Sequence, residues 1–232
     1  MKVLFNADDF GLTKGVTDGI IHAHTKGVVG ATTLMMNGRA TDYAVRKAKA
    51  HPSLKIGIHL VLTWGKPISN DVTSLVDENG LFKFKNTFAS MEPPNVEAVR
   101  KEWMHQIEAF LETGLKLHHI DSHHHVHGWP PLKDIVINLA QQYNVKVRYV
   151  DSLKDEHQLL LTETLYTDFY EQGVNDKIFN RLQSLDTASV EVMTHPAYVD
   201  QDLQEISSYL EKREEELAIL TSLNVPDWAN IV

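Results

Sequence analysis

The 232-residue sequence contains no cysteine. This absence excludes disulfide bonds, thiol nucleophiles, cysteine zinc sites and iron–sulfur clusters, so any bound metal must be held by His, Asp or Glu. The sequence also has no run of about 18 apolar residues, and we expect no membrane-spanning segment. Its first apolar stretch ends at Asn6, which is too early for a signal peptide, so we expect a cytoplasmic protein.

Positive charge is scarce relative to negative charge. Lys and Arg number 22 against 31 Asp and Glu, which gives a formal net charge of -9. Because there is no surplus of cationic side chains to displace counterions, this balance argues against binding to nucleic acid or to anionic membranes. No glycine-rich phosphate loop follows the first predicted strand or occurs elsewhere.

The length and the hydrophobic pattern predict one α/β domain spanning residues 1–232. Strands and helices alternate, which predicts a mostly parallel sheet with helices outside it, and six such units suit a distorted or incomplete (β/α) barrel. Residues 69–95 and 151–188 show no clear pattern. The predicted strands are 2–7, 28–36, 54–62, 115–122, 145–150 and 189–193, and the predicted helices are 15–26, 41–50, 96–113, one beginning at Pro130-Pro131, and 201–220.

Histidine is the residue in excess. The sequence has 13 His, and six of them lie between His118 and His127. In an acidic chain without cysteine, this clustering indicates a metal site of oxygen and nitrogen ligands. Polar clusters lie at the carboxyl ends of four predicted strands, and these ends meet at one rim in a barrel. These clusters are Asp8-Asp9, His59, Asp121–His127 and His195.

The adjacent carboxylates Asp8 and Asp9 repel one another, and a cation would relieve the repulsion. If one of them binds the metal, the other is free to act as a base on water. The alternative interpretation is that the pair caps the helix predicted to begin at Gly15.

His59 lies in the apolar strand Ile56–Leu62. A buried imidazole without a partner costs about 1–3 kcal/mol, and a divalent metal would be one such partner. The alternative is a hydrogen-bonded core histidine.

The histidine cluster follows the fourth predicted strand. Successive side chains alternate sides while the chain stays extended, so alternate residues can face one site. The alternative is a coincidental histidine-rich loop, which would account for His118, His119 and His124. The residues expected to face the site are Asp121, His123, His125 and His127.

His195 precedes Pro196, which restricts it to extended conformations and fixes the direction of its imidazole. With an ordinary pKa near 6.5, a histidine can protonate a leaving group at neutral pH. Asp200 is a candidate for orienting it. The alternative is a structural histidine at a strand end.

Farther along, the charge run Glu211–Glu216 predicts a solvated helix face.

Together, four motifs resemble the YdjC-type carbohydrate deacetylase family: Asn6–Gly11, Gly57–Leu60, Asp121–His127 and Met193–Pro196. Within that family, Val61–Pro67 and the triple histidine resemble the chitin disaccharide deacetylase branch.

The resemblance implies a distorted barrel, a homodimer and hydrolytic removal of acetyl groups from N-acetylglucosamine oligomers. It also implies one divalent metal, usually Mg²⁺, bound by Asp9, His59 and His123, with Asp8 as base and His195 as acid. On ligand preference, Zn²⁺, Mn²⁺ and Co²⁺ suit such a site at least as well.

His125, His127, Trp64 and Trp129 are candidates for lining a sugar site.

Three other classes of protein remain open as interpretations of the same residues. A phosphoesterase would favour basic residues around its anion, and none lies inside the motifs. A glycosidase would need an acidic pair and no metal. A non-catalytic sugar- or metal-binding protein would make the arrangement of Asp8 and His195 accidental.

Overall fold

The structure, a computed structural model, describes residues 1–232. One sheet runs in the order β5-β4-β3-β2-β1-β7-β6, and β8 pairs with the start of β1. All strand pairings are parallel. The strands are β1 (Lys2–Phe10), β2 (Val29–Leu34), β3 (Lys55–Leu60), β4 (His119–Ser122), β5 (Lys146–Val147), β6 (Thr164–Tyr166), β7 (Ser189–Thr194) and β8 (Asn230–Ile231).

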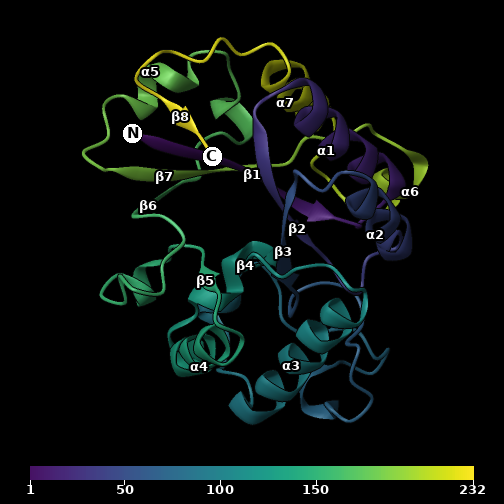
Figure 1. The fold of residues 1–232 in the computed structure, drawn as a ribbon. Helices are drawn as coiled ribbons and strands as arrows, with labels where there is room; N and C mark the ends of the chain where they lie inside the picture. The colour runs from purple at the N-terminus through teal and green to yellow at the C-terminus, as the bar shows by residue number, and fades with distance from the viewer.

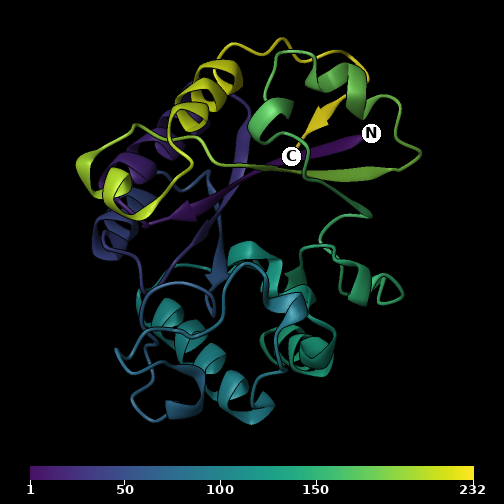
Figure 2. The ribbon, with the colours of Figure 1, turned by 180° about the vertical axis from the view of Figure 1, so that it is seen from behind.

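The sheet curls but does not close (Figures 1 and 2). Its two edges are β5 and β6, and each pairs with only one other named strand. Outside the named strands, a single parallel bridge pairs Val147 of β5 with Leu160, which precedes β6 in the sequence. The prediction of an incomplete (β/α) barrel with mostly parallel strands is therefore confirmed.

Helices cover the outside of the curled sheet (Figure 1). α1, α2, α6 and α7 gather near β1 and β2, whereas α3 and α4 lie on the side of β3 and β4. The apolar residues between the sheet and the helices form one core cluster. The helices are α1 (Lys14–Lys26), α2 (Thr41–Ala50), α3 (Val96–Glu112), α4 (Lys133–Tyr143), α5 (Ile178–Leu182), α6 (Gln201–Ile206) and α7 (Glu211–Leu220).

The start of α1 shows whether Asp8-Asp9 caps this helix, which was the alternative interpretation of that pair. Thr13 is its N-cap residue, and its Oγ1 accepts a hydrogen bond from the Val16 amide at 3.2 Å. Asp200 Oδ2 accepts another from the Gly15 amide at 2.6 Å. Thr13 and Asp200 thus satisfy the helix terminus. The interpretation of Asp8-Asp9 as its cap is wrong.

The helix predicted over 201–220 is wrong as a single element. The chain leaves the helical conformation after α6, and Leu210 has φ -121° and ψ -80°. A local hydrogen bond stabilises the non-helical segment between α6 and α7: the Ser207 hydroxyl accepts from the Tyr209 amide at 3.1 Å. The short strands β6 and β8, absent from the prediction, lie in or beyond the segments that gave no clear pattern.

The chain at the start of the segment 69–95 contacts α3 through hydrogen bonds. The amides of Ile68 and Ser69 each donate to the Glu102 carboxylate at 2.9 Å.

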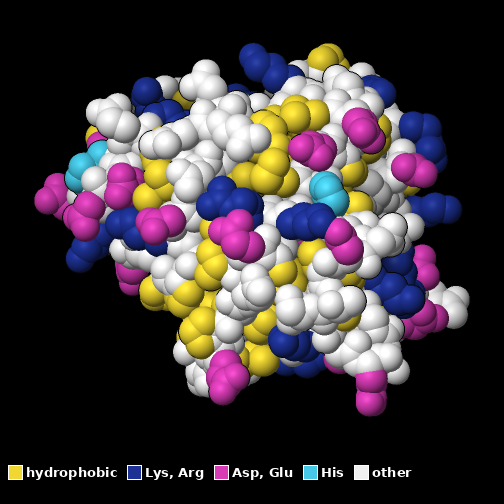
Figure 3. All heavy atoms as spheres, turned by 90° about the horizontal axis from the view of Figure 1, so that it is seen from below, with side chains coloured by type: hydrophobic (Ala, Val, Ile, Leu, Met, Phe, Trp, Pro, Cys, Tyr) yellow, Lys and Arg dark blue, Asp and Glu magenta, His cyan; other side chains and the backbone are white.

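None of the helices is both long and apolar enough to cross a membrane. On the face shown in Figure 3, acidic and basic side chains are interspersed, without a continuous basic patch.

Candidate active site and metal centre

The predicted polar clusters meet at the carboxyl ends of β1, β3, β4 and β7. A cavity of about 460 Å³ opens at this rim. The structure thus brings together in one cavity five residues predicted from the sequence: Asp8, Asp9, His59, His123 and His195.

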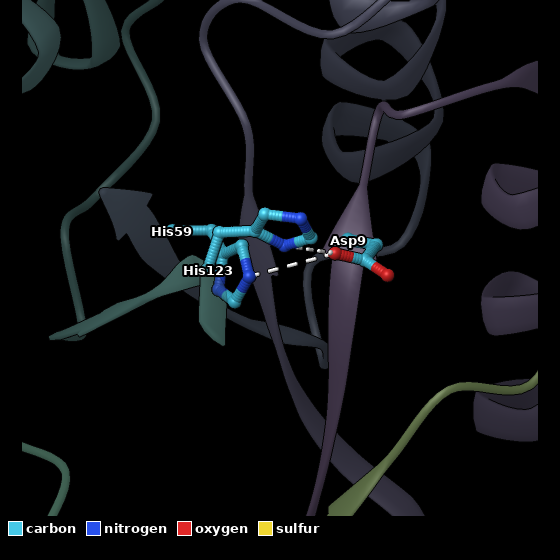
Figure 4. A group of neighbouring side chains, drawn as sticks. All are labelled: Asp9, His59 and His123. Atoms are coloured by element: carbon cyan, nitrogen blue, oxygen red, sulfur yellow. Dashed lines mark ion pairs between the residues drawn. The ribbon is translucent and has the colours of Figure 1, made fainter. Parts of the chain in front are cut away.

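Asp9, His59 and His123 form a group that could hold a metal ion, with one ligand atom from each within 4.8 Å of the others. Asp9 Oδ1 lies 3.1 Å from His123 Nδ1 and 3.5 Å from His59 Nε2 (Figure 4). This buried oxygen faces both imidazoles but accepts no well-aligned hydrogen bond. One carboxylate oxygen and two imidazole nitrogens suit a divalent cation. The residues present therefore fit a metal.

Both aspartates face this cavity although neighbours on a regular strand point to opposite faces. The register of β1 with β2 shifts between Ala7 and Phe10, and Asp9 has φ 67°. A non-glycine residue in this left-handed region costs on the order of 1–3 kcal/mol and persists where its surroundings hold it. The irregularity explains how two adjacent carboxylates serve one site.

Asp121 contacts the ring nitrogen of His59 that points away from Asp9. Its Oδ1 is 2.7 Å from His59 Nδ1, so His59 Nε2 is left to face Asp9. Burial lowers the pKa of His59, but the charge and hydrogen bond of Asp121 outweigh burial and raise that pKa to about 10. A carboxylate partner on the second ring nitrogen fixes the orientation of a metal-binding imidazole.

The alternation predicted for residues 121–127 is wrong beyond Ser122. The chain turns into a 3₁₀ segment, His123–Gly128, in which His124 and His125 have φ 56°. As a result, both His124 and His125 line the cavity. His124, for which the sequence predicted no role in the site, has its Nδ1 2.9 Å from the Thr63 hydroxyl.

His127 is turned away from the cavity and is fully buried. Its Nδ1 lies 2.6 Å from the Ser122 hydroxyl, and its Nε2 lies 3.3 Å from the Arg148 carbonyl oxygen. Its expected place in a sugar site is therefore wrong, because these contacts fix it in the core.

Arg148, which no motif indicated, holds Asp8 through both carboxylate oxygens. Nη1 donates to Oδ2 at 2.7 Å and Nη2 donates to Oδ1 at 2.6 Å. Burial would raise the pKa of Asp8, but the adjacent guanidinium holds that pKa well below its ordinary value. The same guanidinium pairs with Asp121 at 2.9 Å and Glu191 at 2.7 Å.

His195 lies beside Asp8, with Nε2 4.0 Å from Asp8 Oδ2. Burial lowers the pKa of His195 to about 4, so the imidazole is neutral at pH 7. Its backbone amide donates to Glu216 Oε2. Asp200, the expected orienting carboxylate, instead accepts from the Gly15 and Leu203 amides at the starts of α1 and α6.

The charge run Glu211–Glu216 is not uniformly solvated, which corrects the prediction. Arg213 is 5% exposed and Glu216 is fully buried. Arg213 Nη2 donates to Asp9 Oδ2 at 2.7 Å, and Tyr209 donates to Glu216 Oε1 at 2.6 Å. Tertiary partners at the rim account for this burial.

The aromatic candidates separate into two groups. Trp64 lines the cavity, whereas Trp129 is only 4% exposed and packs against Phe84 and Phe88 with ring centroids 5.7 and 5.3 Å away. Trp129 is therefore a core residue, which corrects its expected role. Tyr170, from a segment without sequence signal, also lines the cavity, 5.5 Å from the His195 ring.

The sequence matches the family described as YdjC-like protein over residues 2–230. The chain belongs to this family. A carbohydrate deacetylase of Oceanobacillus iheyensis is 56% identical to this YdjC-like chain over 228 residues, covering 98% of the chain and 99% of the relative. A carbohydrate deacetylase of Brevibacillus brevis is 43% identical over 235 residues, covering 98% of the chain and 94% of the relative.

One solved structure agrees with this membership, and a second shares only the fold. The crystal structure of an Enterococcus faecalis protein named for cellobiose-phosphate cleavage has a TM-score of 0.88 and 35% identity, covering 95% of this chain and 90% of the other. The lactam utilization protein of Thermus thermophilus has a TM-score of 0.54 at 13% identity, covering 95% of each chain, and shares the fold alone. The family resemblance carried by the four motifs is confirmed.

Proposed function

We propose that this YdjC-like protein is a metal-dependent carbohydrate N-deacetylase that removes acetyl groups from N-acetylglucosamine oligosaccharides such as chitobiose, in chitin oligosaccharide degradation. The observation that carries the proposal is the ligand group of Asp9, His59 and His123 in the same cavity as Asp8 and His195. The relatives named carbohydrate deacetylase support the substrate class. The proposal includes a cytoplasmic homodimer.

One divalent cation would be held by Asp9, His59 and His123. Mg²⁺ is the cation that the family resemblance implies, and Zn²⁺, Mn²⁺ and Co²⁺ are the alternatives on ligand preference. When bound, such a cation polarises the acetyl carbonyl and makes water more acidic.

Asp8 accepts a proton from water as the water attacks the acetyl carbon. The pairing with Arg148 keeps Asp8 ionised and directs its carboxylate. His195 is neutral at rest and lies 4.0 Å from Asp8, so it can take up that proton and deliver it to the amine nitrogen as the C–N bond breaks. Water and amide are thereby converted into acetic acid and a free amine, which at neutral pH become acetate and an ammonium group, without an external proton donor.

The test is acetate release from N-acetylglucosamine and its di- and trisaccharides. The protein is first treated with a chelator, and each of the four cations is then added back. Asp9→Ala, His59→Ala and His123→Ala should each abolish cation-dependent release, and His195→Ala should lower turnover by about 10²–10⁴-fold. His157→Ala, at an exposed position, is the matched control.

Wild-type turnover in the three ligand variants would refute the metal site. Acetate release that is insensitive to chelator would refute the metal dependence, and cleavage into shorter sugars without acetate release would favour a glycosidase. Cation binding without any acetate release would favour a non-catalytic sugar- or metal-binding protein.

A further inference from the structure

Two ionisable side chains on the buried face of α7 have no role in the proton transfers described above. Arg213 is 5% exposed and Glu216 is fully buried. Residues three apart on a helix lie on the same face. Burying a charge is costly unless it is paired. Their partners therefore identify what this helix face does.

Arg213 binds one of the two oxygens of Asp9. Nη2 donates to Asp9 Oδ2 at 2.7 Å, and Nε donates to the Tyr209 carbonyl at 3.1 Å, so the guanidinium is itself held in place. The other oxygen, Oδ1, is left facing His59 and His123. A carboxylate fixed in this way offers one oxygen to a cation, in a set direction.

Glu216 makes the corresponding contacts to His195. Oε2 accepts from the His195 amide, and Oε1 accepts from the Tyr209 hydroxyl and lies 3.9 Å from His195 Nδ1. This buried Nδ1 has no hydrogen-bond partner, and the Glu216 carboxylate is the acidic group beside it. Asp9 and His195 are thus both contacted by side chains from the same face of α7.

We propose that Arg213 and Glu216 are positioning residues through which α7 aligns the metal ligand Asp9 and the imidazole of His195. The inference rests on the proposed function for the role of the site. It can nevertheless be measured separately, because cation binding and the state of His195 have readouts other than turnover.

The first test is Mn²⁺ affinity, measured by isothermal titration calorimetry on the full chain. Loss of a positive charge beside a cation site would, by charge alone, tighten Mn²⁺ binding. Loss of a partner that orients a ligand weakens binding, by about 10- to 100-fold for outer partners of metal ligands. The proposal predicts weaker binding in Arg213→Met. Lys212→Met, one residue away at a half-buried position paired with Glu215, should bind Mn²⁺ as the wild type does.

An unchanged or tighter Mn²⁺ affinity in Arg213→Met would overturn the proposal. If Arg213→Met does not fold, Arg213→Lys tests geometry at constant charge, because an ammonium cannot reproduce the fork of a guanidinium. Arg213→Lys should bind Mn²⁺ more weakly, and wild-type affinity would contradict the inference. A wild-type chain that binds Mn²⁺ but releases no acetate would refute the proposed function alone, and a wild-type chain that binds no Mn²⁺ would overturn both.

The second test is Glu216→Gln, which keeps the side-chain shape but replaces one of the two accepting oxygens by an amide group that donates. The proposal predicts a changed NMR signal of the His195 ring and a lower kcat at unchanged KM. A ring signal and a kcat identical to those of the wild type would remove Glu216 from the proposal. Glu214→Gln, on the same helix, is the control for loss of a carboxylate.

Discussion

Replacing Arg148 by methionine should destabilise the folded protein more than any surface charge removal. Arg148 is fully buried and is the cationic partner of Asp8, Asp121 and Glu191. Burial raises the pKa of Glu191 to about 7 despite the nearby guanidinium, so Glu191 can shed its charge by binding a proton. Asp121 retains its contact with His59. Asp8 is the carboxylate left without an equivalent cation.

Removing one partner of a buried ion pair costs about 3–5 kcal/mol, because the remaining charge stays buried. For a chain of this size, about 2–4 °C per kcal/mol corresponds to a fall in Tm of roughly 6–20 °C. Urea and thermal unfolding followed by circular dichroism, with chelator present, measure the loss.

The matched control is Arg39→Met. Arg39 pairs with Asp202 and Glu205 at the surface, where its side chain is 40% exposed. That change should cost no more than about 1 kcal/mol. An Arg148→Met protein as stable as the Arg39→Met protein would refute the argument. Adding Asp8→Asn to Arg148→Met should recover part of the lost stability, since the uncompensated charge is then absent.

Three further predictions concern pH, packing and cation binding. Burial raises the pKa of Glu216 from 4.5 to about 8, so its contribution to stability is complete below about pH 4.5 and is lost as the pH rises through 8; relative to Glu216→Gln, the wild type should lose stability to urea between pH 5 and pH 9. A Cβ on Gly19 would lie 2.4 Å from the Ala197 Cα, so Gly19→Ala should cost about 1–3 kcal/mol and lower turnover by displacing the segment after His195. Mn²⁺ at 100 times its Kd should stabilise the wild type by about 2.7 kcal/mol in a thermal scan, and Asp9→Asn should lose this effect.

Much of the fold could be predicted because the central strands are long and apolar. β1, β2, β3 and β7 are almost entirely buried, and such strands stand out in a sequence. β6 and β8 have only three and two residues and no fully buried side chain. Their pairing depends on the neighbouring strand rather than on their own pattern, so no local signal could have revealed them.

The candidate site was predictable where its residues follow strands. Parallel topology alone brings the ends of β1, β3, β4 and β7 to one rim, so the convergence of their polar residues followed from the alternation of elements. The turn at His123–Gly128 was not predictable from alternation, because His124 and His125 adopt left-handed backbone angles. A buried glutamate in the apolar strand around Glu191 was the one signal for a hidden cation such as Arg148.

The two arginines also explain why an adjacent pair of aspartates divides into two roles. Arg148 donates to both oxygens of Asp8. Arg213 engages one oxygen of Asp9 and leaves the other facing His59 and His123. Nothing in the order Asp8-Asp9 dictates this division. The different surroundings of the two carboxylates come from side chains about 140 and 200 residues away in the sequence, one directly after β5 and the other on α7.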